Sequence, residues 1–167
     1  MKILISSCLL GEDVRFDGAN SSIAFNPKFS FSLKELFMDI LCENEIYSFC
    51  PEVSGGLGIP RTPAEIVKNE KPFIVKDENG LDVTINFLLG AKKALDVCKE
   101  ENIKVALLKA NSPSCGNIKI YDGTFTNNLI DGQGLTARLL KENGIEIFNE
   151  TQLKELSKFI KTNKQFL

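Results

Sequence analysis

The chain has 167 residues, of which 25% are charged and 43% hydrophobic, and its formal net charge is -2. This length and composition fit a single domain over residues 1–167 with a core of its own. The small net charge gives no basic footprint for nucleic acid or anionic lipid, so we expect a small-molecule partner. No apolar run approaches the roughly 18 residues of a membrane helix, and the N-terminus begins as a strand without signal-peptide features. We therefore expect a cytoplasmic protein with no membrane partner.

The chain contains no histidine and five cysteines. The lack of histidine excludes Ser-His-Asp and Cys-His catalysis as usually built, and every histidine-containing zinc site. Acid–base chemistry would fall to carboxylates, lysines, tyrosines, hydroxyls or thiols. Because a reducing compartment disfavours disulfides, we expect the thiols to be either buried filler or ligands.

Short apolar runs alternate with amphipathic segments along the chain. The apolar runs predict strands at residues 2–7, 45–49, 71–75, 103–108, 118–121 and 145–148. Helical periodicity predicts helices near residues 31–41, 84–102, 135–142 and 150–162, the first with Ser32 as its N-cap. This alternation favours a single three-layer α/β domain with a mostly parallel, Rossmann-like sheet.

Three of the five cysteines follow predicted strands. Cys8 follows the first strand, Cys50 follows the second, and Cys115 lies in the turn after residues 103–108. The ends of neighbouring parallel strands lie along one edge of a sheet, so we expect these thiols to converge. Cys42 and Cys98 lie on the apolar faces of predicted helices, which favours core packing for both.

Converging thiols without histidine suit a soft metal. Zinc would usually need four ligands in paired spacing, which this chain lacks. Iron–sulfur clusters are normally held by four cysteines, so three would leave one iron with an open position for a substrate. The spacing alone leaves two alternatives open: cysteines dispersed through a redox-inactive core, and Cys115 acting as a thiol nucleophile.

Two loops carry arginines that suggest binding of a polar substrate group. Arg15 stands beside the turn signal Asp17-Gly18, where an ordinary solvated charge pair is the alternative interpretation. Arg61 follows a glycine-rich segment, in which Gly55 and Gly56 could bring backbone N–H groups close to a ligand or simply cross the surface.

Several separately spaced motifs follow one another along the chain. In order they are Ser-Cys-Leu-Leu-Gly at 7–11, Arg-Phe-Asp-Gly at 15–18, Cys-Pro-Glu-Val at 50–53, Gly-Gly-Leu at 55–57, Pro-Arg-Thr-Pro-Ala-Glu at 60–65, Ser-Pro-Ser-Cys-Gly at 112–116 and Tyr-Asp-Gly-Thr-Phe at 121–125. Together these motifs resemble those of the DUF523 family, which includes the bacterial thiouracil desulfidases. The resemblance covers nearly the whole chain, from Met1 to about Glu150.

This resemblance implies an iron–sulfur-dependent, non-redox desulfidase. Such an enzyme removes sulfur from a thiolated pyrimidine or related thionucleobase by hydrolysis and releases hydrosulfide. The resemblance implies a 4Fe-4S cluster held by Cys8, Cys50 and Cys115, with one open iron that takes the substrate sulfur. Glu52 and Ser112 resemble the family's catalytic pair. Substrate-binding roles are expected for Arg15, Asp17, Gly55, Gly56, Arg61 and Ser114.

The chain departs from the family pattern in two places. A lysine often follows the Asp-Gly of the second motif, whereas residues 19–22 supply none, and Asn111 stands where an arginine is usual. Both departures remove positive charge near the expected pocket, so the substrate could be a different thioamide or thionucleobase. The alternative function is an iron–sulfur or metal-binding accessory protein in sulfur handling, without turnover of its own.

Overall fold

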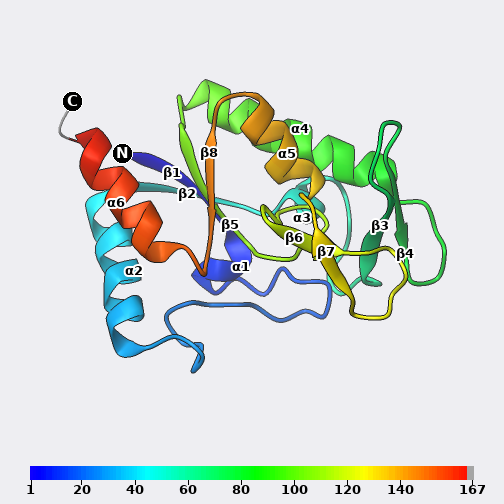
Figure 1. Cartoon of the computed structure of the whole chain (residues 1–167), viewed down its shortest axis with the longest axis horizontal. Helices are drawn as coiled ribbons and strands as arrows, with labels where there is room; N and C mark the ends of the chain where they lie inside the picture. Colours follow the sequence, from blue (N-terminus) through cyan, green and yellow to red (C-terminus); the bar gives the residue numbers. More distant parts are fainter. Residues whose placement is uncertain (165–167) are drawn as a thin grey trace.

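The computed structural model describes residues 1–164. Its centre is a four-stranded sheet with the order β2-β1-β5-β8, in which every neighbouring pair is parallel (Figure 1). The strands are β1 (Lys2–Ser6), β2 (Glu45–Phe49), β5 (Val105–Leu108) and β8 (Glu146–Asn149). Because all four run in the same direction, their carboxyl ends lie along one edge of the sheet.

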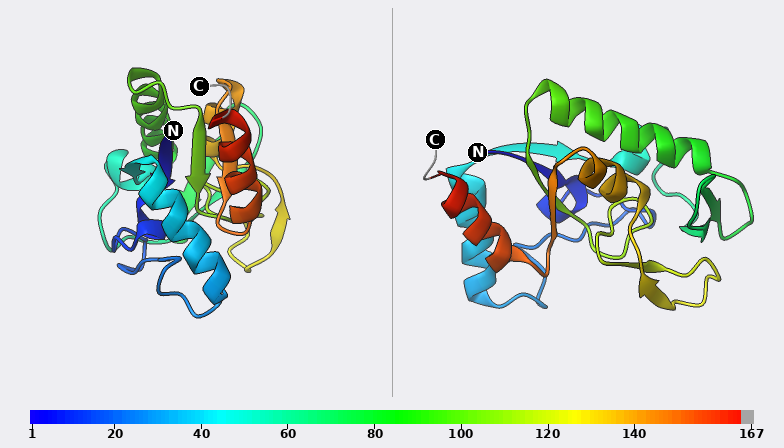
Figure 2. Two further views of the ribbon diagram at one scale, coloured as in Figure 1. Left: turned by 90° about the vertical axis from the view of Figure 1, so that its left-hand side faces the viewer. Right: turned by 45° about the horizontal axis from the view of Figure 1, so that its top comes forward.

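Helices cover both faces of this sheet. One face packs against α2 (Phe31–Glu43) and α6 (Leu153–Lys164), and the other against α4 (Thr84–Glu100) and α5 (Leu135–Glu142), as the two views of Figure 2 show. Ile3 and Ile5 of β1 point into the first core and Leu4 into the second. Burial on both faces explains why these strands are continuous apolar runs.

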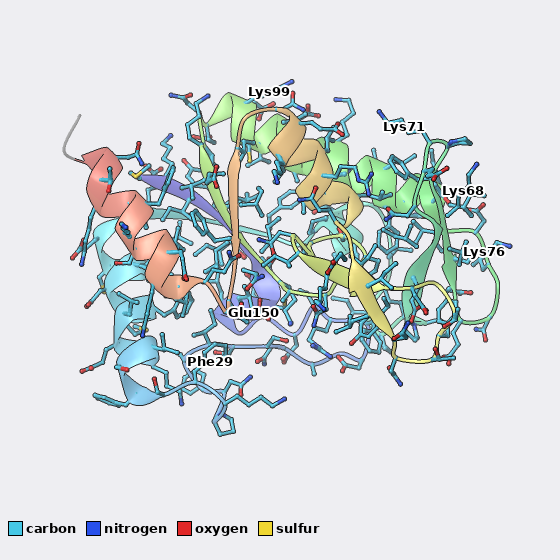
Figure 3. The ribbon with its side chains drawn as sticks, in the orientation of Figure 1. Phe29, Lys68, Lys71, Lys76, Lys99 and Glu150 are labelled. Atoms are coloured by element: carbon cyan, nitrogen blue, oxygen red, sulfur yellow. The ribbon has the colours of Figure 1, made fainter. Side chains whose placement is uncertain are left out.

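Two antiparallel hairpins pack near the amino-terminal half of α4. The first joins β3 (Ala64–Lys68) to β4 (Ile74–Asp77), and the second joins β6 (Lys119–Tyr121) to β7 (Leu129–Asp131) (Figure 1). A third apolar cluster, which includes Ile66, Phe87 and Ile120, fixes the hairpins to α4. In Figure 3, Lys68, Lys71 and Lys76 project outward from the first hairpin.

Two single-turn helices begin directly at the ends of strands. The first, α1 (Ser7–Leu10), follows β1, and the second, α3 (Pro51–Ser54), follows β2. Pro51 is favourable at the first position of a helix because that residue needs no N–H partner. These turns place Cys8 within α1 and Cys50 at the N-cap of α3.

The predicted α/β class and mostly parallel sheet are confirmed. β3, β7 and the two single-turn helices were not predicted from the sequence, and β4 begins at Ile74, three residues later than predicted. Ser30 rather than Ser32 caps α2, because its side chain accepts the N–H of Leu33. Cys42, expected in the core, is exposed, whereas Cys98 is buried.

Among residues 1–164, no helix is long and apolar enough to cross a membrane.

Candidate active site

A pocket of about 310 Å³ opens at the carboxyl edge of the central sheet. The ends of β1, β2 and β5 supply Ser6, Phe49 and Lys109 to its lining. The pocket is also lined by all three strand-end cysteines: Cys8, Cys50 and Cys115. This volume falls within the usual range for small-molecule sites, of about 300–1,000 Å³. The strand order β2-β1-β5 therefore brings together three thiols that are far apart in sequence.

The three thiols are close enough to affect one another's ionisation. Burial raises the pKa of Cys8 to about 12, and the nearby ammonium of Lys109 opposes this shift while Cys50 adds to it. Burial also raises the pKa of Cys115, which the Ser6 hydroxyl opposes and the Cys8 thiol reinforces. The pKa of Cys50 is raised by burial as well. A metal centre bound here would have to displace the protons of these thiols, because cysteine binds metals as the thiolate.

The chemistry of these donors fits an iron–sulfur cluster better than a single metal ion. Within residues 1–164, no three histidine, cysteine or acidic side chains are placed to hold one metal ion. A four-iron cluster attaches each thiolate to a different iron and therefore needs ligands spread around a larger body. Cys8, Cys50 and Cys115 all line one cavity and supply three soft donors, a donor type that fits such a cluster.

Glu52 is fixed within the pocket by two neighbours. The guanidinium of Arg61 donates from Nε (2.9 Å) and Nη2 (2.7 Å) to Oε2 of Glu52. The hydroxyl of Ser112 donates to the other oxygen, Oε1, at 3.4 Å. Arg61 also donates to the carbonyl of Val14, which secures the arginine against the opposite loop. The carboxylate is thus held on one side and turned towards Ser112 on the other.

Close backbone packing positions the turn that carries Glu52. A Cβ on Gly55 would lie 2.1 Å from the carbonyl oxygen of Asn86, and a Cβ on Gly90 would lie 2.0 Å from that of Pro51. The Asn86 side chain donates to the carbonyl of Gly55 at 2.9 Å. These contacts lock α3 against α4. Gly55 and Gly56, expected to bind substrate, lie outside the pocket lining, and Gly55 instead permits this helix contact.

The turn after β5 holds Cys115 through its own hydrogen bonds. The Ser112 side-chain oxygen accepts the backbone N–H groups of Ser114 and Cys115, each at 3.1 Å. Ser114 is 1% exposed and its hydroxyl lies 2.9 Å from that of Thr136 in α5. Ser114, predicted to bind substrate, therefore lies beneath the pocket, where it anchors the turn to α5. Ser112 and Cys115 line the pocket itself.

Arg15 lines the pocket, but Asp17 does not. The two side chains form a paired contact, with Arg15 Nε 3.2 Å from Oδ1 of Asp17 and Nη2 3.1 Å from Oδ2. Arg15 lowers the pKa of Asp17 through this hydrogen bonding. A third bond, from Nη1 to the Ser21 hydroxyl, completes the support. Asp17 thus orients an arginine that faces the cavity.

Several residues line the pocket although no site role was predicted for them, among them Ser6, Phe16, Glu65, Lys109, Tyr121 and Asn127. Two features of the sequence could have indicated that some of these residues line the pocket. Lys109 directly follows β5, at the edge where ligands bind in such sheets. Glu65 and Tyr121 lie within motifs that carried the family resemblance. Lys109 lines the pocket together with Asn111, and its ammonium is paired with the carboxylate of Glu150.

The chain matches the 2-thiouracil desulfurase family over residues 3–152. The chain belongs to the 2-thiouracil desulfurase family. This membership confirms the resemblance carried by the motifs, and the match includes every residue of the pocket described above.

Two relatives extend the comparison for this desulfurase-family chain. It is 36% identical over 160 residues to the uncharacterised protein YbbK of Bacillus subtilis, covering 92% of this chain and 99% of YbbK. It also resembles the solved structure of the [4Fe-4S]-dependent thiouracil desulfidase TudS, with 42% identity and a TM-score of 0.82. That superposition covers 96% of this chain and 98% of TudS. The α/β fold is therefore the fold of a family member described as iron–sulfur dependent.

Proposed function

We propose that this protein is an iron–sulfur-dependent, non-redox desulfidase that hydrolyses the C=S group of a thiolated pyrimidine such as 2-thiouracil. The observation that carries the proposal is that three thiols and the Glu52–Ser112 pair line one pocket. Family membership and the similarity to TudS support the same reaction. We further propose that residues 1–167 act as one domain in the cytoplasm, with a thionucleobase rather than nucleic acid as the partner.

In this proposal Cys8, Cys50 and Cys115 would hold a 4Fe-4S cluster and leave one iron without a protein ligand. When bound, the cluster would supply a Lewis acid that accepts the substrate sulfur and makes the C=S carbon electrophilic. The three thiols come from separate chain segments that the sheet and its loops hold in place. Among the described residues, Cys42 and Cys98 do not line the pocket and have no role in the proposed site.

The protein's own residues would handle the water and its protons. Oε1 of Glu52 is the proposed base, and it takes one proton from the attacking water. The water oxygen bonds to the former C=S carbon, the C–S bond breaks, and the second proton leaves with sulfur as hydrosulfide. Ser112, whose oxygen is fixed by two backbone N–H groups, orients the water or the forming oxygen. No electron enters or leaves in this sequence.

The remaining polar residues would bind the ring. Arg15 and Arg61 both reach the pocket, and each is held by a carboxylate, Asp17 and Glu52 respectively. Because these pairs are preformed, the arginines need little reorganisation when a polar ring oxygen or nitrogen binds. The proposed roles of Asp17 and Ser114 are to position Arg15 and the Cys115 turn.

The test is anaerobic reconstitution with iron and sulfide, followed by a sulfide-release assay with 2-thiouracil. We expect the reconstituted protein to be brown and to release hydrosulfide and uracil in equal amounts. The visible absorption should be lost in Cys8→Ala, Cys50→Ala and Cys115→Ala. The matched controls Cys42→Ala and Cys98→Ala should keep the colour. Protein that stays coloured but releases no sulfide from any thiolated base would instead indicate the accessory role. Colourless protein inactivated by alkylation of Cys115 would indicate a thiol nucleophile.

A further inference from the structure

Glu65 places a carboxylate in the pocket with only one of its two oxygens hydrogen-bonded. The residue belongs to β3, is 7% exposed and lines the cavity. Its Oε2 accepts the backbone N–H groups of Gly123 at 2.9 Å and Phe125 at 3.1 Å. Within residues 1–164, no donor reaches Oε1 and no lysine or arginine forms an ion pair with Glu65. A carboxylate oxygen that lacks a protein donor and belongs to a cavity-lining residue is an open acceptor for a ligand.

The loop that holds Glu65 has a backbone adapted to this contact. Gly123 has a φ of +87°, and a Cβ there would lie 2.7 Å from the carbonyl oxygen of Ile66. Only glycine lets the loop lie this close to β3. Phe125 and Asn127 also adopt left-handed backbone conformations, with φ values of 59° and 61°. Strained backbone of this kind is concentrated at ligand sites, and Asn127 lines the same pocket.

Glu65 differs from Glu52, the other acidic residue that lines the cavity. Glu52 is paired with Arg61, and the two remaining cations of the lining, Arg15 and Lys109, are paired with Asp17 and Glu150. The cations that face the pocket thus already have carboxylate partners. The free oxygen of Glu65 is therefore available to accept a neutral N–H group of the ligand. A thiolated pyrimidine carries such ring N–H groups beside its C=S carbon, and an N–H bound to a carboxylate forms one of the stronger hydrogen bonds.

We propose that Oε1 of Glu65 accepts a ring N–H of the substrate and so restricts the enzyme to thionucleobases that are unsubstituted at that nitrogen. This inference rests on the proposed function, since it names the ring edge that the same pocket recognises. An N-alkylated ring, or a nucleoside joined through that nitrogen, would leave the carboxylate without a donor and bring a carbon against it. Sites built to bond an N–H reject analogues that lack it strongly.

The test measures equilibrium binding to the reconstituted protein by calorimetry, with uracil, 1-methyluracil, 3-methyluracil and 1,3-dimethyluracil. Uracil keeps both ring N–H groups and is not turned over. We expect wild-type protein to bind uracil at least about tenfold more tightly than one of the two monomethyl compounds. Glu65→Gln turns the acceptor into an amide and should weaken uracil binding by about tenfold, while binding of that methylated compound changes by less than about twofold.

Asp77→Asn is the matched control. Asp77 belongs to the same hairpin, is also 7% exposed and accepts the N–H of Leu81, but it does not line the pocket. We expect Asp77→Asn to bind all four compounds as the wild type does, which separates the role of Glu65 from general weakening of the hairpin.

Three results would overturn the inference: no binding of uracil, equal wild-type affinity for uracil and 1,3-dimethyluracil, or equal weakening of every compound by Glu65→Gln. The comparison of the four compounds with wild-type protein does not depend on whether a variant folds. If 2-thiouracil releases sulfide but methylation has no effect on binding, only this inference fails. If methylation matters but no sulfide is released, the proposed reaction fails and the role of Glu65 stands.

Discussion

The hydroxyl of Ser6 donates a hydrogen bond to the sulfur of Cys115 at 3.5 Å, across a separation of 109 residues. The same oxygen accepts the backbone N–H of Lys109 at 3.0 Å. Ser6 is the last residue of β1 and is 2% exposed, so this bond is shielded from water. One buried hydroxyl therefore joins the end of β1 to the turn after β5 and contacts a proposed cluster ligand.

Ser6→Ala should make the midpoint potential of the reconstituted cluster more negative without abolishing its colour. A hydrogen bond to a ligating sulfur stabilises the more electron-rich, reduced cluster, so its loss favours the oxidised state. The measurement is a redox titration followed by electron paramagnetic resonance. Ser7→Ala is the control, because the Ser7 hydroxyl contacts that of Ser48 at 2.7 Å and no sulfur. Equal potentials for both variants and the wild type would contradict the role of Ser6.

Glu52→Gln should lower kcat for sulfide release by about 100- to 10,000-fold, which is the usual contribution of a general base. The amide keeps the size of the side chain but cannot take a proton from water. Iron content and visible absorption should match the wild type, because Glu52 is not a proposed ligand. Glu78→Gln changes an exposed carboxylate outside the pocket lining and should keep full activity. Wild-type turnover in Glu52→Gln would remove this residue from the mechanism.

Lys109→Met should lower the free energy of unfolding of the cluster-free protein by about 2 kcal/mol. Lys109 Nζ lies 2.6 Å from Oε1 of Glu150, whose side chain is 10% exposed and whose other oxygen accepts the N–H of Ala110. Figure 3 shows Glu150 at the carboxyl end of β8. Removing the lysine leaves a mostly buried carboxylate without its cation, which costs several kcal/mol when burial is complete.

Denaturant unfolding of Lys109→Met is best compared with that of Lys92→Met. Lys92 pairs with Asp96 on the exposed side of α4, with side chains 68% and 44% exposed. Exposed pairs contribute about 0.5 kcal/mol or less, so Lys92→Met should be nearly neutral. Similar losses for both variants would show that the Lys109–Glu150 pair adds nothing beyond a surface contact.

Cys98 should make the cluster-free protein less stable as the pH rises above about 9. Burial raises the pKa of this thiol to about 11, whereas in the unfolded chain it ionises near its ordinary value of about 8.5. Between these two values the unfolded state binds fewer protons than the native state, so the free energy of unfolding falls with rising pH. Urea unfolding of wild type and Cys98→Ala at pH 8 and pH 10 measures the difference.

The variant should lose less stability than the wild type between the two pH values. The packing lost in Cys98→Ala destabilises the variant at both pH values, so it cancels when the pH dependence of the two proteins is compared. Iodoacetamide at pH 8 provides a second reading, because exposed Cys42 should react well before buried Cys98. Parallel pH dependence of the two proteins would contradict the shift at Cys98.

The central sheet could be predicted because its strands are apolar on both faces and are joined by amphipathic helices. The hairpins were harder, since β7 has only three residues and β3 carries a buried glutamate that breaks its apolar pattern. Residue chemistry and motif order identified Glu52 and the cysteines as candidates. Gly55 shows the limit of that approach: its pattern indicated a close backbone approach, but only the packed structure reveals that the neighbour is Asn86.

Glu65 and Lys109 were missed for the same physical reason. The sequence offers a motif for Glu65 and a strand end for Lys109, but neither signal shows that tertiary contacts with a distant loop or strand place the residue in the pocket. The family motifs contain Glu65 but do not reveal that one of its oxygens is already occupied by the backbone of residues 123–125.

The strand order β2-β1-β5 also bears on when during synthesis the proposed cluster could be acquired. Cys8, Cys50 and Cys115 approach one another only after three separate strands have paired, whereas closely spaced cysteine motifs collect metal while a chain is still unfolded. The third thiol is therefore available only after residues 1–115 have left the ribosome. Delivery of iron and sulfide to the proposed site would accordingly follow pairing of these strands.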